Sequence, residues 1–123
     1  MIKLSSLKKS FGFALEGIRF AWKKDQNLRV HAVVALIVIV VSIVLKVSAF
    51  EKSILGVMIL LVIIAEMVNS AIEQMVDLIT KEHRMEAKLA KDVASGMVLI
   101  TVFGSVIVGI LIFTPYLLQL GGD

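Results

Sequence analysis

Cysteine is absent from this chain of 123 residues, proline occurs once, and aromatic residues make up only 7%. Without cysteine the protein has no disulfide bonds and no thiolate metal sites. Charged residues are also scarce, at 19%, whereas 59% of the residues are hydrophobic and the mean hydropathy is +0.96. This balance lies far outside the usual composition of a soluble domain. The composition therefore predicts an integral membrane protein.

Three long apolar segments dominate the sequence, and they are interrupted only by short charged stretches. The segments predict transmembrane helices at about residues 30–47, 53–79 and 92–118, because each is long enough to cross the hydrocarbon core as a helix. The first is the shortest, so we expect Arg29 and Lys46 to snorkel at its two ends. The prediction is an all-α membrane protein in which residues 30–123 form a three-span domain.

Residues 1–29 have a different pattern, in which apolar side chains recur every three or four positions between charged ones. This periodicity predicts an amphipathic helix that lies in the membrane interface. Glu16 and Arg19 interrupt every apolar stretch long enough for the core of a signal peptide, so we expect this helix to remain on the protein. The apolar positions are Leu4, Leu7, Phe11, Ala14, Ile18 and Trp22.

The basic residues gather before the first span and between the second and third spans, and only Lys46 and Lys52 flank the remaining turn. The positive-inside rule therefore predicts that the N-terminus and the loop at residues 80–92 are cytoplasmic. The net charge of +3 fits contact with anionic lipid. It requires no nucleic acid as a partner.

The second span carries Glu66, Asn69, Glu73 and Asp77 in an otherwise apolar segment. At about 100° per residue they fall at about 0°, −60°, −20° and +20°, so they form one polar stripe along a helix. The stripe is roughly 16 Å long and leads from within the membrane toward the cytoplasmic surface. Ionisable residues inside a membrane are energetically costly and indicate a functional site.

Acidic and basic groups meet where this stripe reaches the cytoplasmic loop. Carboxylates one or two helical turns apart can bind Mg²⁺ together with substrate phosphates, and nearby lysines can bind a polyphosphate. We therefore predict phosphoryl transfer, with Glu66 deep enough to meet the hydroxyl of a lipid. The chain contains no G-x-x-x-x-G-K-[ST] loop, so a nucleotide site must be built differently.

Two motifs, EMVNSAIEQMVD at residues 66–77 and AKDVASG at residues 90–96, resemble those of the small bacterial integral-membrane lipid kinases, the family of diacylglycerol kinase and undecaprenol kinase. The similarity extends over nearly the whole chain. It implies a homotrimer in the bacterial cell membrane with active sites shared between protomers. It also implies that Mg-ATP phosphorylates a membrane-embedded alcohol.

The resemblance implies that Glu66 is the catalytic base, that Asn69 supports the reaction centre, and that Asp25 and Glu73 bind Mg²⁺. The nucleotide contacts that we expect are Asp25, Glu73, Glu82, His83, Arg84, Lys91 and Asp92. The lipid contacts that we expect are Glu66, Ser95, Glu16, Arg19 and Trp22.

The sequence departs from the family pattern at two positions, because Asp25 stands where Glu is usual and Ser6 where a basic residue is frequent. The His83 loop and the stretch at residues 113–115 look more like the undecaprenol-preferring members. We therefore expect undecaprenol as the acceptor, with diacylglycerol as the alternative.

Simpler interpretations exist for each of these features. The stripe could be a structural polar network between helices, Asp77 could pair with a loop lysine, and His31 could be an interfacial residue. The basic residues of the loop could serve only to orient the protein in the membrane, namely Lys81, Arg84, Lys88 and Lys91. The rival function is a small ion-coupled transporter, which would need a polar path through the uncharged residues 53–65.

Overall fold

The structure, a computed structural model, describes residues 1–122 and is helical throughout. Its four helices are α1 (Leu4–Lys24), α2 (Gln26–Val44), α3 (Ala49–Ile79) and α4 (Met85–Gly121), and residues 1–122 contain no strand. By length and composition α2, α3 and α4 are each able to cross a membrane. The prediction of an all-helical fold is therefore confirmed, and α2, α3 and α4 are three candidate membrane spans, as expected for a multi-pass membrane protein.

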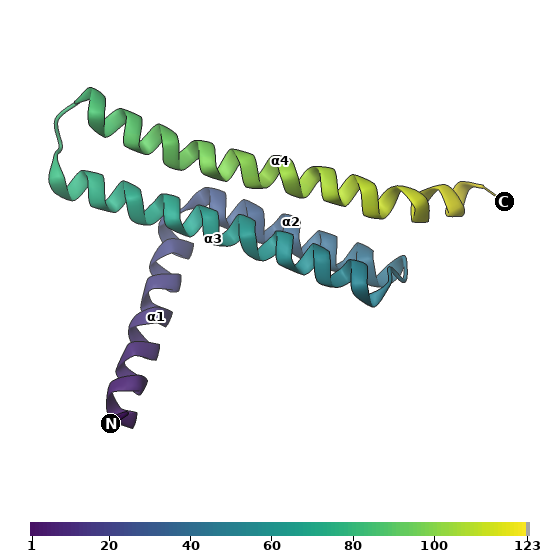
Figure 1. Cartoon of the computed structure of the whole chain (residues 1–123), viewed down its shortest axis with the longest axis horizontal. Coiled ribbons are helices and arrows are strands. Elements are labelled where there is room, and N and C mark those ends of the chain that lie inside the picture. The colour runs from purple at the N-terminus through teal and green to yellow at the C-terminus, as the bar shows by residue number, and fades with distance from the viewer. Residues whose placement is uncertain (123) are drawn as a thin grey trace.

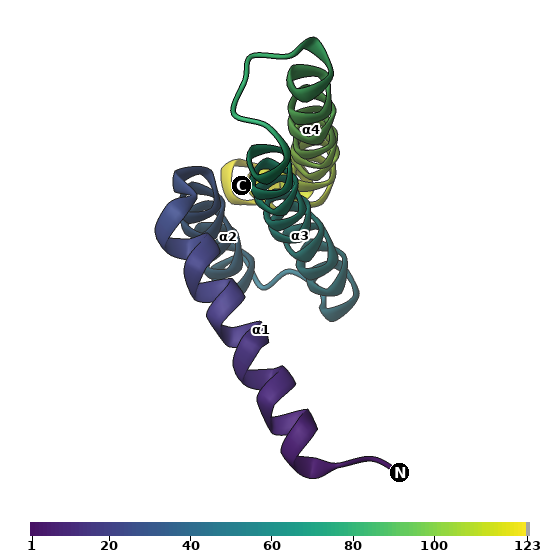
Figure 2. The ribbon, with the colours of Figure 1, turned by 90° about the vertical axis from the view of Figure 1, so that its left-hand side faces the viewer.

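The three long helices run beside one another, and α1 projects from them at a steep angle (Figures 1 and 2). Helix α3 is central, because it packs along α4 and also contacts α2. Helix α1 makes its main contacts with α2, near the point where the two helices meet. We call this junction, residues 22–29, the corner.

Local capping explains why α2 and α3 each begin before the apolar segment that they contain. Asp25 caps α2, since its side chain accepts hydrogen bonds from the backbone N–H groups of Asn27 and Leu28 at 2.9 and 3.2 Å. Ser48 caps α3 by accepting from the N–H of Glu51. Helix α4 begins at Met85 because residues 85–92 are mostly strong helix formers.

The short connection between α2 and α3 forms what we call the turn end of the bundle. Its buried residues Val47, Leu55 and Ile112 bring together the α2–α3 connection, α3 and the last part of α4. Val38, Val108 and Phe113 pack around them. Most other large apolar side chains of the long helices are exposed in the single chain, as expected where lipid or another protomer covers them.

Candidate active site

The polar stripe of α3 passes from buried to exposed along the helix. Glu66 is only 2% exposed and Asn69 only 7%, whereas Glu73 is half-buried and Asp77 is exposed. Glu66 is the most deeply buried large side chain among the described residues. A carboxylate that is buried so completely in a membrane-spanning helix is expected to have a function.

A polar cavity of about 230 Å³ opens where the corner meets α3. Its walls include Asp25 from the corner and Glu66, Asn69, Ser70 and Glu73 from α3. The structure therefore brings together four residues that the sequence analysis had assigned to catalysis and metal binding. Asp25 reaches this place because it is the single residue between α1 and α2.

Hydrogen bonds organise one side of this cavity. The Ser70 hydroxyl donates to Asp25 Oδ2 at 2.7 Å, while Asp25 Oδ1 accepts the two capping N–H groups of α2. Asn69 Nδ2 lies 3.5 Å from Glu73 Oε1, at the outer limit of a hydrogen bond. Asp25 and Glu73 thus reach the cavity from two elements that are distant in sequence.

The environment of Asp25 favours its charged form. Burial acts to raise the pKa of this carboxyl, but the neighbouring Glu66 carboxyl, the Ser70 hydroxyl and the two capping amides together hold its pKa below the ordinary value of 3.8. Asp25 is therefore a carboxylate at neutral pH. An ionised carboxylate is the form that binds a hard cation.

Glu66 Oε1 and Asn69 Oδ1 are both buried without a hydrogen-bond partner among the described residues. A buried polar atom without a partner costs about 1 to 3 kcal/mol, so two of them side by side require an explanation. His31 Nε2 approaches Glu66 Oε2 to 3.8 Å, which is too long for a hydrogen bond. Both orphaned oxygens belong to residues that line the polar cavity.

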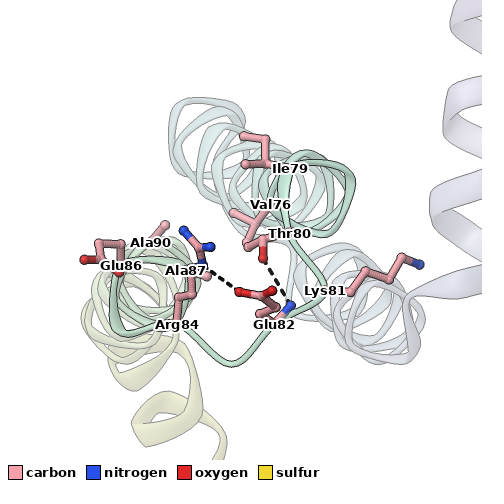
Figure 3. A pocket seen from close by; sticks show the side chains of 9 residues that line it. All are labelled: Val76, Ile79, Thr80, Lys81, Glu82, Arg84, Glu86, Ala87 and Ala90. Carbon is pink, nitrogen blue, oxygen red and sulfur yellow. Dashed lines mark hydrogen bonds and ion pairs between the residues drawn. The ribbon is translucent and has the colours of Figure 1, made fainter.

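Two adjoining pockets of about 710 and 590 Å³ lie at the other end of the stripe, around the loop at residues 80–84. Figure 3 shows the side chains that line the first of them. Arg84 Nε donates to Glu82 Oε2 at 3.0 Å, and the Glu82 N–H donates to Thr80 Oγ1 at 3.1 Å. Figure 3 shows both contacts as dashed lines within the loop between α3 and α4. We call this region the loop end.

The basic and acidic residues at the loop end are paired with one another. Lys91 Nζ donates to Asp77 Oδ1 at 2.7 Å, and Lys88 Nζ donates to Asp92 Oδ2 at 2.6 Å. Asp77 is thus paired with a lysine, as the simpler interpretation of this residue predicts, and the partner is Lys91. One pocket is lined by all five of the nucleotide contacts expected beyond α3, namely Glu82, His83, Arg84, Lys91 and Asp92.

The residues expected to contact lipid do not gather at one place, apart from Glu66. Glu16, Arg19 and Trp22 are exposed on α1, and Ser95 is exposed on α4. None of these four side chains lines the polar cavity. In the single chain the polar cavity is therefore separate from the predicted nucleotide contacts at the loop end. It is also separate from the predicted lipid contacts on α1 and α4.

No three Asp, Glu or His side chains within residues 1–122 are close enough together to form a metal-binding cluster. Besides Glu66, the cavity has two carboxylates that could bind a metal ion, Asp25 and Glu73. Magnesium commonly takes only one or two protein carboxylates and completes its octahedral shell with water and phosphate oxygens. The residues present fit such a partial site.

Three contacts near the site were not anticipated from the sequence. These are the Ser70 bond to Asp25, the approach of His31 to Glu66, and the bonds of Arg29 Nη1 to the carbonyls of Trp22 and Lys23 at 3.0 and 2.9 Å. Helical spacing gave one usable signal, because Ser70 lies four residues after Glu66 and so shares its face. The other two contacts depend on how α1, α2 and α3 pack.

The fold and the site together define a class: an all-helical membrane protein that carries a buried acidic cavity in its second span. Comparison with known families then gives a match to prokaryotic diacylglycerol kinase over residues 12–113. The chain therefore belongs to this family of lipid kinases.

The individual relatives agree with this assignment. The chain is 37% identical over 115 residues to the undecaprenol kinase of Bacillus subtilis, covering 94% of each chain. It is 36% identical over 99 residues to the diacylglycerol kinase of Escherichia coli K12, covering 80% of this chain and 81% of that one. It is also 37% identical over 112 residues to the diacylglycerol kinase of Synechocystis, of which it spans 64% of the length.

Proposed function

We propose that this protein transfers the γ-phosphate of ATP, with Mg²⁺, to the hydroxyl of a membrane-embedded lipid alcohol and so forms the lipid monophosphate. Membership of the family and the names of the relatives support the reaction class. The single observation that carries the proposal is the buried Glu66 carboxylate with its unpartnered Oε1 beside a polar cavity.

Glu66 is the general base in this proposal. A base must lie within hydrogen-bond reach of the hydroxyl that it deprotonates, and the orphaned Oε1 provides an acceptor for that hydroxyl. Its depth in α3 suits a hydroxyl that remains attached to a lipid. Asn69, one turn further along the same face, supports the reaction centre through its own unpaired Oδ1 and its contact with Glu73.

Asp25 and Glu73 would hold Mg²⁺ in the cavity, where the ion offsets negative charge on the transferred phosphoryl group. Asp25 is suited to this role because its hydrogen bonds keep it ionised. Asp25 and Glu73 would also contact the nucleotide, by way of the Mg²⁺ ion that they hold. Their convergence from the corner and from α3 supports the pairing.

The loop end would bind the rest of the nucleotide. In this proposal Lys91 contacts phosphate, Asp92 lies toward the adenosine, and Glu82, His83 and Arg84 border the nucleotide. Lys91 and Asp92 are paired with Asp77 and Lys88 in the single chain, so nucleotide binding would exchange those partners for the ligand. Exposed pairs of this kind are worth little, typically below about 1 kcal/mol, and are readily exchanged.

We propose that residues 1–29 form an amphipathic interfacial segment, with α1 (Leu4–Lys24) as its helix, and that residues 30–123 form the transmembrane kinase domain. The exposed apolar side chains of α1, including Leu4, Leu7 and Phe11, would enter the lipid surface. The polar edge of α1, Glu16 and Arg19, together with Trp22 and with Ser95 of α4, would contact the lipid substrate. The N-terminus would face the cytoplasm of a bacterial cell, with the protein in its cell membrane.

We also propose a homotrimer with active sites shared between protomers. Two features of the single chain favour shared sites. The polar cavity and the pocket around Lys91 have no wall residue in common, and much of the apolar surface of α4 is uncovered. Another protomer would cover part of that surface and bring the missing contacts to each cavity. The number three comes from the family resemblance.

The acceptor lipid that we favour is undecaprenol, with diacylglycerol as the alternative. The undecaprenol kinase of Bacillus subtilis supports the choice, because its match covers 94% of both chains. No observation in residues 1–122 favours the ion-coupled transporter, since the stretch of α3 from Ser53 to Ala65 carries no charge. We therefore propose no second function.

The test of the acceptor is a competition assay in mixed micelles. Purified protein would receive γ-labelled ATP with equal concentrations of undecaprenol and diacylglycerol, with and without Mg²⁺. We expect a magnesium-dependent product that is mainly undecaprenyl phosphate. A product that is mainly phosphatidic acid would correct the acceptor, and the absence of labelled lipid would refute the kinase proposal.

A further inference from the structure

The corner is held by reciprocal capping between α1 and α2. Asp25 accepts the first N–H groups of α2, and Arg29 of α2 donates to the last carbonyls of α1 at Trp22 and Lys23. Asp25 alone separates the two helices, so no flexible segment lies between them. These contacts fix α1 and α2 relative to each other, but they do not fix either helix relative to α3.

Ser70 provides the connection to α3. Its hydroxyl donates to Asp25 Oδ2 at 2.7 Å across 45 positions of sequence, and both residues line the polar cavity. Ser70 lies one helical turn after Glu66 and three residues before Glu73, so the bond attaches the corner to the face that carries both carboxylates.

The Ser70 hydroxyl bonds differently from three other serine and threonine hydroxyl groups in the long helices. Ser42, Thr101 and Ser105 each donate to a carbonyl three residues back in their own helix, at 2.7 to 2.8 Å, which is the common local bond of a serine or threonine inside a helix. The Ser70 hydroxyl instead crosses between elements. Helical serine therefore does not require this geometry, and the contact with Asp25 calls for its own explanation.

We infer that Ser70 is a positioning residue, whose hydroxyl holds the Asp25 carboxylate, and with it the corner and α1, at a set place relative to Glu66 and Glu73. Asp25 Oδ2 keeps acceptor capacity beyond this bond, because each carboxylate oxygen has two lone pairs. Insofar as Asp25 binds Mg²⁺, the inference rests on the proposed function. The anchoring of the corner does not.

Side chains that orient a metal ligand typically change metal affinity roughly 10- to 100-fold when removed. Ser70→Ala is therefore expected to raise the Mg²⁺ concentration for half-maximal phosphate transfer by at least roughly tenfold. Ser70→Thr retains the hydroxyl and should keep the value near that of the unchanged protein. Ser42→Ala is the matched control, because it removes a buried hydroxyl that bonds only within α2.

A second readout is independent of catalysis. Trp22 is the only tryptophan of the chain and lies in the last turn of α1, three residues before Asp25. Its fluorescence anisotropy, measured in micelles without nucleotide or lipid substrate, reports how firmly the corner is held. We expect Ser70→Ala to lower this anisotropy and Ser70→Thr and Ser42→Ala to leave it unchanged.

The two readouts separate the inference from the proposed function. Unchanged Trp22 anisotropy in Ser70→Ala overturns the anchoring role, whatever the activity. A lowered anisotropy with an unchanged Mg²⁺ requirement overturns the role toward the metal. If the anisotropy falls as expected but the unaltered protein transfers no phosphate, the proposed function fails while the anchoring of the corner by Ser70 stands.

Discussion

The turn end and the polar cavity differ in whether their buried and half-buried polar groups have hydrogen-bond partners. At the turn end the Tyr116 hydroxyl donates to Glu51 Oε1 at 2.6 Å and accepts from the Ser48 N–H at 3.2 Å. The Ser48 hydroxyl donates to the same carboxylate at 2.8 Å. In the cavity, by contrast, Glu66 and Asn69 each leave a buried oxygen without a partner.

This difference separates two uses of polar side chains in one small membrane protein. Paired groups beside an apolar cluster hold the ends of α3 and α4 together and need nothing further. Unpaired buried oxygens lower stability and are retained where a substrate can supply the missing partner. Substitutions in the cavity should therefore affect chemistry more than stability, and substitutions at the turn end should do the reverse.

The largest expected effect is that of Glu66→Gln, which keeps the size of the side chain and removes the base. Turnover should fall by roughly 100- to 10,000-fold, the usual contribution of a general base, while nucleotide binding is retained. Phosphate transfer and nucleotide affinity would be measured on the same preparation. Equal losses in both would indicate that Glu66 has a structural role instead.

Glu73→Gln should weaken the response to Mg²⁺ while the protein stays folded. Loss of one of two carboxylate ligands is expected to raise the half-maximal Mg²⁺ concentration by roughly tenfold or more, as Mg²⁺ relies on few protein ligands. The control is Glu51→Gln at the turn end, which should leave the Mg²⁺ requirement unchanged. An unaltered requirement in Glu73→Gln would remove this residue from the metal site.

Ile112→Ala should lower stability and leave the Mg²⁺ requirement unchanged, which is the opposite of the effects expected for Glu73→Gln. Ile112 is 6% exposed in the cluster at the turn end, and truncation of a buried isoleucine typically costs about 2 to 5 kcal/mol. Ile110→Ala is the matched control, since Ile110 is 60% exposed on the same helix. Denaturation in micelles should show the larger loss for Ile112→Ala, with the Mg²⁺ requirement unchanged in both. A large change in that requirement would contradict the separation of the two regions.

The smallest effect concerns Lys46, which has a positive φ of 56° in the connection between α2 and α3. A left-handed conformation costs a residue with a Cβ roughly 1 kcal/mol, so Lys46→Gly should stabilise the protein by up to about that amount. Lys52→Gly, within α3, should instead destabilise by about 1 kcal/mol. The two denaturation midpoints should therefore move in opposite directions, and a shift in the same direction would contradict this account of the turn.

The sequence was sufficient to predict the helical fold, because apolar segments of this length have few other solutions in a bilayer. It also placed Glu66, Asn69 and Glu73 on one face, since that relation depends only on the periodicity of a helix. The contacts of Asp25 with Ser70 and of Tyr116 with Glu51 could not be predicted in this way. They join residues 45 and 65 positions apart and depend on how separate helices pack.

The roles of the predicted site residues remain predictions, although the structure explains their different surroundings. Asp25, Glu66, Asn69 and Glu73 share a cavity because the corner, in which Asp25 alone separates α1 from α2, lies beside this part of α3. Lys91 and Asp92 instead lie beside the loop end, in a separate pocket. A sequence pattern cannot show that the two groups lie in separate pockets of the single chain. It contains no information on how the helices pack or on an assembly that would bring the two pockets together.

The most direct test of the central claim is the stoichiometry of phosphate transfer. Purified protein would be given Mg-ATP and undecaprenol in vesicles, and ADP and lipid monophosphate would be quantified together over time. The account predicts equal amounts of the two products, no ADP when the lipid alcohol is omitted, and neither product for Glu66→Gln. Formation of ADP without lipid phosphate, or lipid phosphate formation at an undiminished rate in Glu66→Gln, would contradict it.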